Sequence, residues 1–418
     1  MPPTATPEAR GLAATPAPPP AVAPADERSA SSSILPEMTG RKLAETVFGS
    51  RRENDLIAWR VETGSDGLGW PEVTRQGNLL VADDQGVASI APDGRIAWRH
   101  PREAWTHARP KSTSDGGCVW SPGNGGLVGL DPQGRPRWRW GEGLQMQTIQ
   151  PALGPDDTAY VCVRDEGWKL QAVGSDGQTR WSASLDMHAS SPPVVHPDGK
   201  VSVRVDLAEE TLLSTFDPQG QKLHQANIPG RVEGRPALAP DGSVWIGNDS
   251  GGLFRVSAEG QLSQVFQARG GIRAMPRIEE DGRVFFGTMK GMVYGLEPDG
   301  TKAWEVDLKG MVESRIERMA DGTLLVGTFD KVLHALTPEG QSKWQMPLPF
   351  AGGDALAVSN DGTVYAAGGR QVLALREGGI QADLGRTGSA EPPADGTIAT
   401  EGDDWVVIGD VKLPVRRA

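Results

Sequence analysis

Cysteine is scarce in this sequence, and the shortage limits what the thiols can do. The 418 residues contain only Cys118 and Cys162, which stand far apart. Two cysteines cannot form the dense disulfide framework of a small secreted domain. Counted from the repeated turns described below, they occupy positions of opposite parity, so they should point to opposite faces of their strands. We expect two free, buried thiols.

Other absences exclude further classes of protein. No apolar run approaches the ~20 residues of a membrane-spanning helix. A net charge of −12 argues against a protein that binds nucleic acid by neutralising phosphates. The N-terminus has neither a charged start followed by an apolar stretch nor a cysteine for a lipid anchor. We therefore expect a cytoplasmic location, with a periplasmic or extracytoplasmic one as the alternative.

Composition changes along the chain and suggests four segments. Residues 1–34 are rich in Pro, Ala and Ser, and they predict a disordered tail. Residues 35–54 suit a short helix or linker, residues 55–411 a repeat domain, and residues 412–418 a basic C-terminal tail. Gly (54), Pro (33) and Trp (13) are abundant while Phe (8) and Tyr (3) are few, which is typical of short strands joined by tight turns.

A glycine turn followed by an apolar strand recurs along the repeat domain. Positions two and four after the glycine are mostly apolar, which is the periodicity of a strand. Examples after Gly242, Gly282 and Gly322 are SVWIGN, RVFFGT and TLLVGT. A second apolar strand follows each of these, and no helical periodicity intervenes.

A second landmark places an aromatic residue at a fixed distance from a turn. Glycines at 94, 134, 177, 220, 260, 300 and 340 stand four residues before Trp98, Trp138, Trp181, His224, Gln264, Trp304 and Trp344. Trp59 lies one period before Trp98. We predict that Trp59, Trp98, Trp138, Trp181, Trp304 and Trp344 dock structurally across the junctions between repeat units, and that His224 substitutes for such a ring.

About four short strands in every ~40 residues is the pattern of a β-propeller blade. The sequence therefore predicts an all-β fold: a single propeller of eight four-stranded blades, with nine as the alternative. An open array would leave strand edges unpaired, so we expect N- and C-terminal strands to pair and close the ring. Residues 55–63 would pair with the strands over 397–402 and 404–410.

The Gly-x-x-x-Trp units resemble those of the PQQ-like (pyrroloquinoline quinone) β-propeller repeat family over roughly residues 55–410. That family includes quinoprotein dehydrogenases, outer-membrane assembly lipoproteins and sensor modules of receptor kinases, so the resemblance implies the fold more than the function. The dehydrogenases hold PQQ beside a disulfide between adjacent cysteines, with a calcium site. Cys118 and Cys162 are not adjacent and no calcium loop is recognisable, so we expect no quinone cofactor, and PQQ stays the alternative.

Candidate ligand-binding residues lie where the chain enters each inner strand, close to a proline. They share strand parity and would surround one mouth of the central channel. They are Trp70, His107, Arg109, Gln150, Glu233, Arg235, Arg273, Glu313 and Arg315. One interpretation is a partly cationic ring for a carboxylate-rich small molecule or an acidic peptide. The other is a ring of ion pairs between neighbouring blades.

The sequence predicts no catalytic residues and no metal site. The six histidines form no His-x-x-x-His pair. We therefore expect a monomeric, non-enzymatic propeller that acts as a protein-interaction scaffold or ligand-binding sensor module through one face. Its partner would be a protein or a small anionic ligand, with no nucleic acid and no membrane span. The alternative is a PQQ-dependent oxidoreductase or a lyase-type propeller enzyme with its site at the channel mouth.

Overall fold

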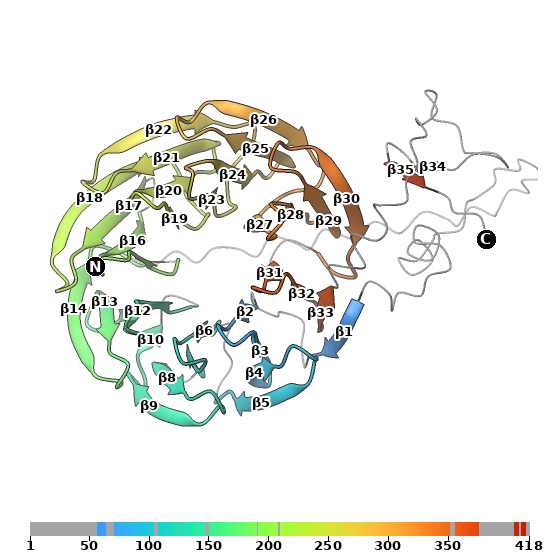
Figure 1. Cartoon of the computed structure of the whole chain (residues 1–418). Coiled ribbons are helices and arrows are strands. Elements are labelled where there is room, and N and C mark those ends of the chain that lie inside the picture. Colours follow the sequence, from blue (N-terminus) through green and yellow to red (C-terminus); the bar gives the residue numbers. More distant parts are fainter. Residues whose placement is uncertain are drawn as a thin grey trace, which may run out of the picture. The chain divides into compact units, whose positions relative to one another are not determined.

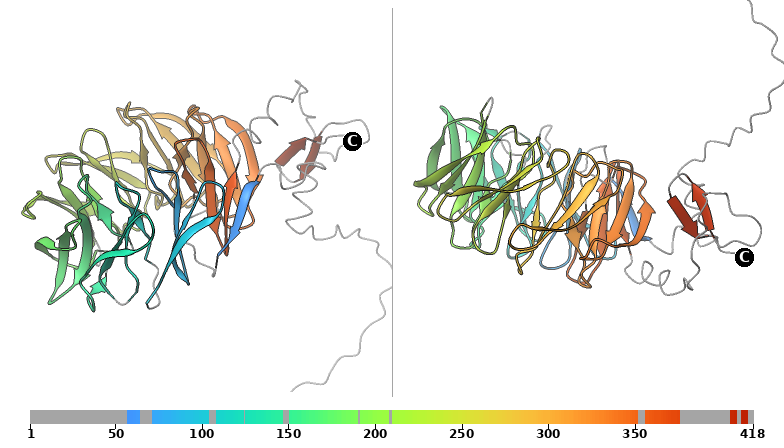
Figure 2. Two further views of the ribbon diagram at one scale, coloured as in Figure 1. Left: turned by 60° about the horizontal axis from the view of Figure 1, so that its bottom comes forward. Right: turned by 90° about the horizontal axis from the view of Figure 1, so that it is seen from above.

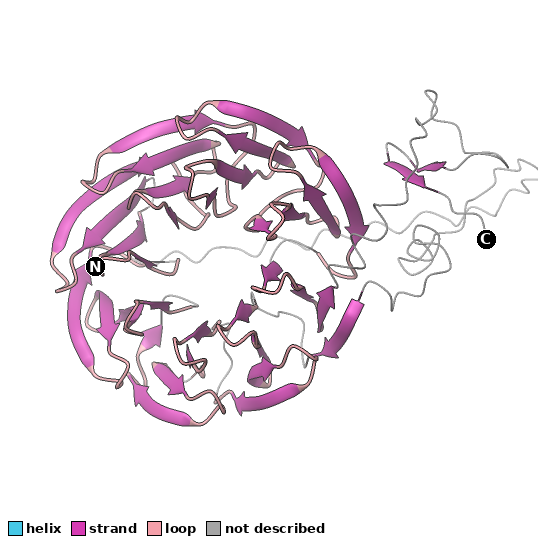
Figure 3. Ribbon diagram, in the orientation of Figure 1, coloured by secondary structure: helices cyan, strands magenta, loops and turns pink. Residues whose placement is uncertain are grey.

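The structure, a computed structural model, describes residues 57–63, 71–103, 108–123, 125–146, 150–189, 191–207, 210–351, 356–375, 405–408 and 411–414. Within these ranges the regular structure is β-strand, and none of them forms a helix that could span a membrane (Figure 3). The tail predicted over 1–34, the helix or linker predicted over 35–54 and the strand predicted over 397–402 lie outside the described residues.

The first four blades follow one another along the chain, and each is an antiparallel sheet. Blade 1 consists of β2 (Glu72–Val73), β3 (Leu79–Asp83), β4 (Gly86–Ile90) and β5 (Ile96–Pro101). Blade 2 consists of β6 (Lys111–Ser112), β7 (Cys118–Trp120), β8 (Leu127–Leu130) and β9 (Pro136–Trp140). Blade 3 consists of β10 (Gln145–Met146) and β11 (Ala152–Leu153), which both pair with β12 (Ala159–Arg164), then β13 (Trp168–Val173) and β14 (Thr179–Leu185). Blade 4 consists of β15 (Val194–Val195), β16 (Val201–Asp206), β17 (Glu210–Phe216) and β18 (Lys222–Pro229).

The next four blades complete the ring, and the last of them includes β1, from the N-terminal end of the described chain. Blade 5 consists of β19 (Ala237–Leu238), β20 (Val244–Gly247), β21 (Gly252–Val256) and β22 (Leu262–Gln267). Blade 6 consists of β23 (Arg277–Ile278), β24 (Val284–Gly287), β25 (Met292–Leu296) and β26 (Lys302–Asp307). Blade 7 consists of β27 (Glu317–Arg318), β28 (Leu324–Gly327), β29 (Val332–Leu336) and β30 (Ser342–Pro347). Blade 8 consists of β31 (Leu356–Val358), β32 (Val364–Gly368), β33 (Gln371–Leu375) and β1 (Ile57–Glu62).

These eight sheets form a ring around a channel lined by the short inner strands, which confirms the predicted eight-bladed propeller (Figure 1). The strands run between two faces of the ring (Figure 2). We call one the loop face, because it carries the loops from each outer strand to the next inner strand, such as 231–236, 271–276 and 311–316. The backbone N–H groups of Asp249, Met289 and Phe329 donate to the carbonyls of Arg231, Gly271 and Met311 there. The opposite face, which carries the glycine turns, is the turn face.

The ring is closed by β1, the first strand of the chain that the structure describes. β1 pairs antiparallel with β33 and becomes the outer strand of blade 8 (Figure 1). Closure through an N-terminal strand was predicted, but the partner expected at 397–402 and 404–410 was wrong. β34 (Trp405–Ile408) instead pairs with β35 (Val411–Pro414) in a separate two-stranded sheet. β33 already ends an apolar three-stranded sheet whose free edge accepts β1, so the ring needs no later strand.

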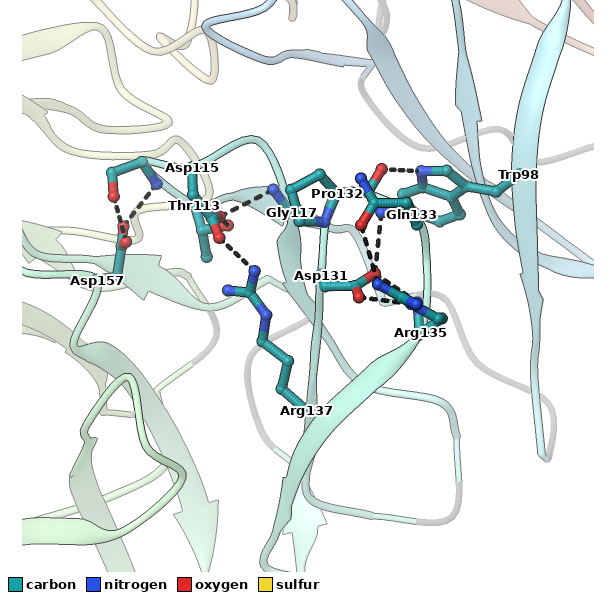
Figure 4. A network of polar contacts seen from close by, with 11 residues as sticks. Trp98, Thr113, Asp115, Gly117, Asp131, Pro132, Gln133, Arg135, Arg137 and Asp157 are labelled. Atoms are coloured by element: carbon teal, nitrogen blue, oxygen red, sulfur yellow. Dashed lines mark hydrogen bonds and ion pairs between the residues drawn. The ribbon is translucent and has the colours of Figure 1, made fainter.

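The recurring turns owe their shape to local hydrogen bonds. In the turn Asp131-Pro132-Gln133-Gly134, the Asp131 carboxylate accepts the N–H groups of Gln133 and Arg135, each at 2.9 Å (Figure 4). Gly134 has φ +78°, and a Cβ there would lie 2.6 Å from the Trp98 ring. Both the backbone conformation and the close ring therefore require glycine at this position.

The large rings after these turns lie at the junctions between blades. The indole N–H groups of Trp59, Trp98, Trp181 and Trp304 donate to the carbonyls of Pro92, Pro132, Pro218 and Pro338 in the next blade, at 2.7, 2.8, 2.8 and 2.9 Å. Trp138 lies against Gly177 of the following blade in the same way. Trp344 packs beside the apolar cluster shared by blades 7 and 8. Four of these six rings thus cover a turn and also donate a hydrogen bond to one of its carbonyls.

We expect Trp304→Ala to lower the free energy of unfolding by about 3–5 kcal/mol, the usual cost of truncating a large packed aromatic. The ring stacks on Phe285 at a centroid distance of 5.8 Å and covers Gly340. Urea titration followed by circular dichroism measures the change. Trp168→Ala is the control, because Trp168 contacts His188 at the loop-face end of blade 3 and spans no turn. Equal losses in the two variants would contradict a special role for the junction rings.

Candidate functional site

The loop-face mouth of the channel carries a chain of ion pairs built from blades 5, 6 and 7. Arg273 is its centre: its guanidinium lies 2.7 Å from Glu233, 3.1 Å from Asp249 and 3.9 Å from Glu313. The hydrogen bonds that Arg273 donates to the Asp249 carboxylate are the main reason why the pKa of Arg273 is raised. Glu233, Arg273 and Glu313 are each about 30% exposed, so these charges lie at the mouth but are already satisfied by one another.

Gln150 and Arg235 join blades that are not neighbours. Gln150 is 8% exposed and donates its amide N–H to the Pro110 carbonyl of blade 2 at 3.2 Å. Its side-chain oxygen accepts a hydrogen bond from Arg235 of blade 5, also at 3.2 Å. Two of the predicted mouth residues therefore tie blades 2, 3 and 5 together.

The remaining predicted mouth residues are less engaged with this chain of ion pairs. Arg315 lies 3.6 Å from Glu317 on the same segment and is 43% exposed. Arg109 is half-buried just before β6. Trp70 and His107 lie outside the described residues. The paired carboxylates and guanidiniums match the interpretation of a ring of ion pairs more closely than that of an open cationic ring.

A second layer of charge lies deeper in the channel, on the inner strands themselves. Lys111 of blade 2 lies 2.6 Å from Glu72 of blade 1. In blade 6, Arg277 lies 2.5 Å from Glu279, whose other oxygen lies 2.6 Å from Arg318 of blade 7. Glu279 is 6% exposed, so its carboxylate is buried between two guanidiniums.

Glu317 occupies the same layer with looser pairing. Its closest cationic atoms, on Arg277 and Arg315, are 3.5 and 3.6 Å away. Burial raises the pKa of the Glu317 carboxyl, and nearby Glu72 raises it further, against the opposing effect of the two arginines. Our sequence analysis missed this layer because it considered the residues before each proline. Pro71-Glu72, Pro110-Lys111 and Pro276-Arg277 show that the informative position is the one that follows.

An exposed patch occupies the loop face of blades 6 and 7, on the turns between their two middle strands. We call it the loop-face patch and define it as Lys290, Phe329 and Lys331. Phe329 is 48% exposed. Lys290 and Lys331 are exposed and make no ion pair with the described residues. Arg269 and Lys309, 66% and 75% exposed, lie on the neighbouring loops of the same face and pair only with outer-strand carboxylates.

The two thiols do not contribute to the mouth. Cys118 and Cys162 are free and fully buried, as predicted, and they belong to different core clusters. Burial raises the pKa of each thiol. They therefore cannot form the disulfide between adjacent cysteines found in quinone dehydrogenases with similar repeats. Among the described residues, no three His, Cys, Asp or Glu side chains are grouped to hold a metal ion.

Comparison with protein families agrees with this architecture. Residues 208–404 match the PQQ-like repeat model described as outer membrane protein assembly factor BamB. This match supports the resemblance to the PQQ-like repeat family over residues 208–404. No curated protein matches the chain. The PQQ-like match begins in blade 4 and includes the ion pairs of blades 5–7 and the loop-face patch.

Solved structures resemble the PQQ-like ring at low sequence identity. BamB from Moraxella catarrhalis is 19% identical with a TM-score of 0.56, over 76% of this chain and 98% of that one. The computationally designed Ika8 protein is 14% identical with a TM-score of 0.61, over 77% and 99%. The quinohemoprotein alcohol dehydrogenase from Comamonas testosteroni is 12% identical with a TM-score of 0.60, over 87% and 82%. An assembly factor, a designed protein and an enzyme thus share this fold, which leaves the function to the surface and the site.

Proposed function

We propose that this propeller is a non-enzymatic protein-interaction module, and that the loop-face patch docks an acidic segment of its partner. The observation that carries the proposal is an exposed aromatic ring, Phe329, with two lysines on adjacent turns that make no ion pair within the described residues. Exposed aromatic side chains of this kind are enriched at the centres of protein interfaces. Unpaired cations beside them attract an acidic partner and orient it.

Two features of the molecule support this choice over a ligand in the channel mouth. Glu233, Arg273 and Glu313 neutralise one another, so a small anion would have to displace a carboxylate from Arg273. By contrast, the lysines of the patch have no ion pair in the described part of the chain that an acidic segment would have to break. The chain as a whole carries a net charge of −12, so two lysines that outnumber the exposed Asp330 at this patch favour an acidic partner here over the rest of the surface.

The proposal includes no quinone cofactor and no catalytic residue. The buried, separated thiols support that choice. Similarity to the BamB fold also supports a binding role, since BamB is described as an assembly factor.

Site-specific photo-crosslinking tests the docking surface. We expect a photoreactive residue at position 329 to give a discrete adduct with an interacting protein from the source cells. The same residue at position 223 should give none, because Leu223 is also 48% exposed but lies on the outer strand β18 of blade 4. Lys290→Glu combined with Lys331→Glu should reduce the adduct about tenfold, because it replaces attraction by repulsion.

Charge reversal on the turn face is the matched control. Arg75→Glu combined with Arg95→Glu changes the net charge equally, and both residues are exposed on turns of blade 1. This control should leave the adduct at position 329 unchanged. An adduct that forms equally at position 223, or that resists the two lysine substitutions, would refute the loop-face patch as the docking surface.

A further inference from the structure

The junction between blades 4 and 5 lacks the tryptophan that most other junctions contain. In blades 3, 6 and 8, an aromatic residue on the second strand contacts the junction tryptophan: Tyr160 with Trp181, Phe285 with Trp304 and Tyr365 with Trp59, at centroid distances of 5.8, 5.8 and 5.7 Å. Between the two rings, on the third strand, stands Ala172, Gly295 or Ala374. A small middle residue thus lets two large rings meet.

Blade 4 has hydrogen-bonding residues at all three of these positions. The three residues are Ser202, Thr215 and His224. Ser202 on β16 pairs with Thr215 on β17, and Thr215 pairs with His224 on β18. The Ser202 hydroxyl lies 2.9 Å from the His196 imidazole and 2.8 Å from the Thr215 hydroxyl. Ser202 is fully buried, so this network replaces an aromatic pair inside the blade.

His224 occupies the place of the indole but fills less of it. The imidazole lies against Gly260, and its Nε2 is 3.2 Å from the Ala258 carbonyl, which corresponds to the carbonyl that the tryptophans reach in other junctions. An imidazole has one ring where an indole has two. A pocket of about 260 Å³ lies beside this smaller ring, between blades 4 and 5 on the turn face.

The walls of this pocket combine polar and apolar surface. Blade 4 contributes His196, Thr215 and His224, and blade 5 contributes Pro240, Val256 and Ala258. The charged residues at the rim are already paired: Asp198 with Lys200 at 2.8 Å, and Asp241 with Arg255 at 2.6 Å. Burial lowers the pKa of His196, which keeps that imidazole neutral at neutral pH. The pocket therefore offers apolar walls, two imidazole rings and a hydroxyl, and the charges at its rim are paired with one another.

We propose that this pocket binds a neutral heteroaromatic ring system of about indole size. The volume is close to that of the smallest ligand sites in proteins, which suits one or two fused rings. A ring nitrogen of the ligand has the His196 and His224 imidazoles and the Thr215 hydroxyl as hydrogen-bonding partners. The site lies on the turn face, so it is distinct from the loop-face patch and does not depend on the proposed function.

Titration with indole, followed by the NMR signals of the histidine rings, tests the site. We expect saturable shifts of the His196 and His224 signals. His224→Trp should weaken indole binding at least about tenfold, because the new side chain fills the pocket. Ala258→Leu narrows the same pocket from blade 5 and should have the same effect if the first variant does not fold. Gln264→Trp is the control, since it adds an indole to the exposed side of β22 outside the pocket lining and should leave binding unchanged.

A second arm distinguishes a free ring compound from a tryptophan side chain of a partner. N-acetyl-tryptophan amide carries the indole on a peptide backbone. If indole binds and N-acetyl-tryptophan amide does not, the pocket takes a free ring compound. If both probes bind, the pocket also accepts the tryptophan side chain of a partner. No saturable shift with either probe, or equal binding by the wild type and His224→Trp, would overturn the proposal.

Discussion

Deleting residues 51–64 is expected to destabilise the entire ring, with a loss of more than about 5 kcal/mol in the free energy of unfolding. The deletion removes β1, which pairs with β33 from Ile57 to Glu62 and supplies the outer strand of blade 8. It also removes Trp59, whose indole bridges to Pro92 of blade 1. Both the edge of blade 8 and the junction that closes the ring are lost together, so the effect should exceed that of truncating one aromatic side chain.

Hydrogen exchange separates a global effect from local fraying. If closure stabilises the ring cooperatively, amide protons of blade 5, on the opposite part of the ring, should exchange faster in the deletion variant (Figure 1). A chain that lacks only residues 1–50 keeps β1 and should behave like the full-length protein. If the deletion variant melts at the same temperature as the full-length protein, β1 does not close the ring.

The fold could be predicted from the sequence because the same turn and the same ring packing recur at most junctions between blades. The turn glycines such as Gly134 and the rings such as Trp98 recur because each junction has the same geometry, and a repeated constraint is visible without a structure. The pairing partner of β1 was not predictable in the same way. Residues 371–375 and 404–410 both have the pattern of apolar strands. Periodicity identifies a strand but does not show which of the two has an unpaired edge for β1.

The candidate site was less predictable, for a different physical reason. Parity and the nearby prolines indicated that Glu233, Arg273 and Glu313 lie together at the mouth, and the structure brings them together. The link between Gln150 and Arg235 crosses from blade 3 to blade 5, and nothing in a repeat of neighbours indicates such a contact. The pocket beside His224 also escaped prediction, because the size of a gap depends on the residues that surround the substitution.

The charged layer inside the channel gives the second large expected effect. Glu279→Gln should lower the free energy of unfolding by about 3–5 kcal/mol, because it removes the buried carboxylate that Arg277 and Arg318 share. Urea titration at neutral pH measures the loss. Glu279 is almost inaccessible, so solvent cannot replace the missing charge.

Glu317→Gln is the matched control in the same layer, and the two carboxyls should behave oppositely. Glu317 lies 3.5 Å from Arg277 and 3.6 Å from Arg315, and burial raises the pKa of its carboxyl, so the folded state disfavours its ionised form. At neutral pH the neutral amide should leave stability unchanged or increase it.

A carboxyl with a raised pKa stabilises the fold most at a pH below its unfolded pKa and loses that contribution as the pH rises through its folded pKa. The free energy of unfolding of the wild type should therefore rise relative to that of Glu317→Gln as the pH falls from neutral into the acidic range. A loss for Glu317→Gln as large as that for Glu279→Gln would show that distance and burial do not separate these two carboxyls.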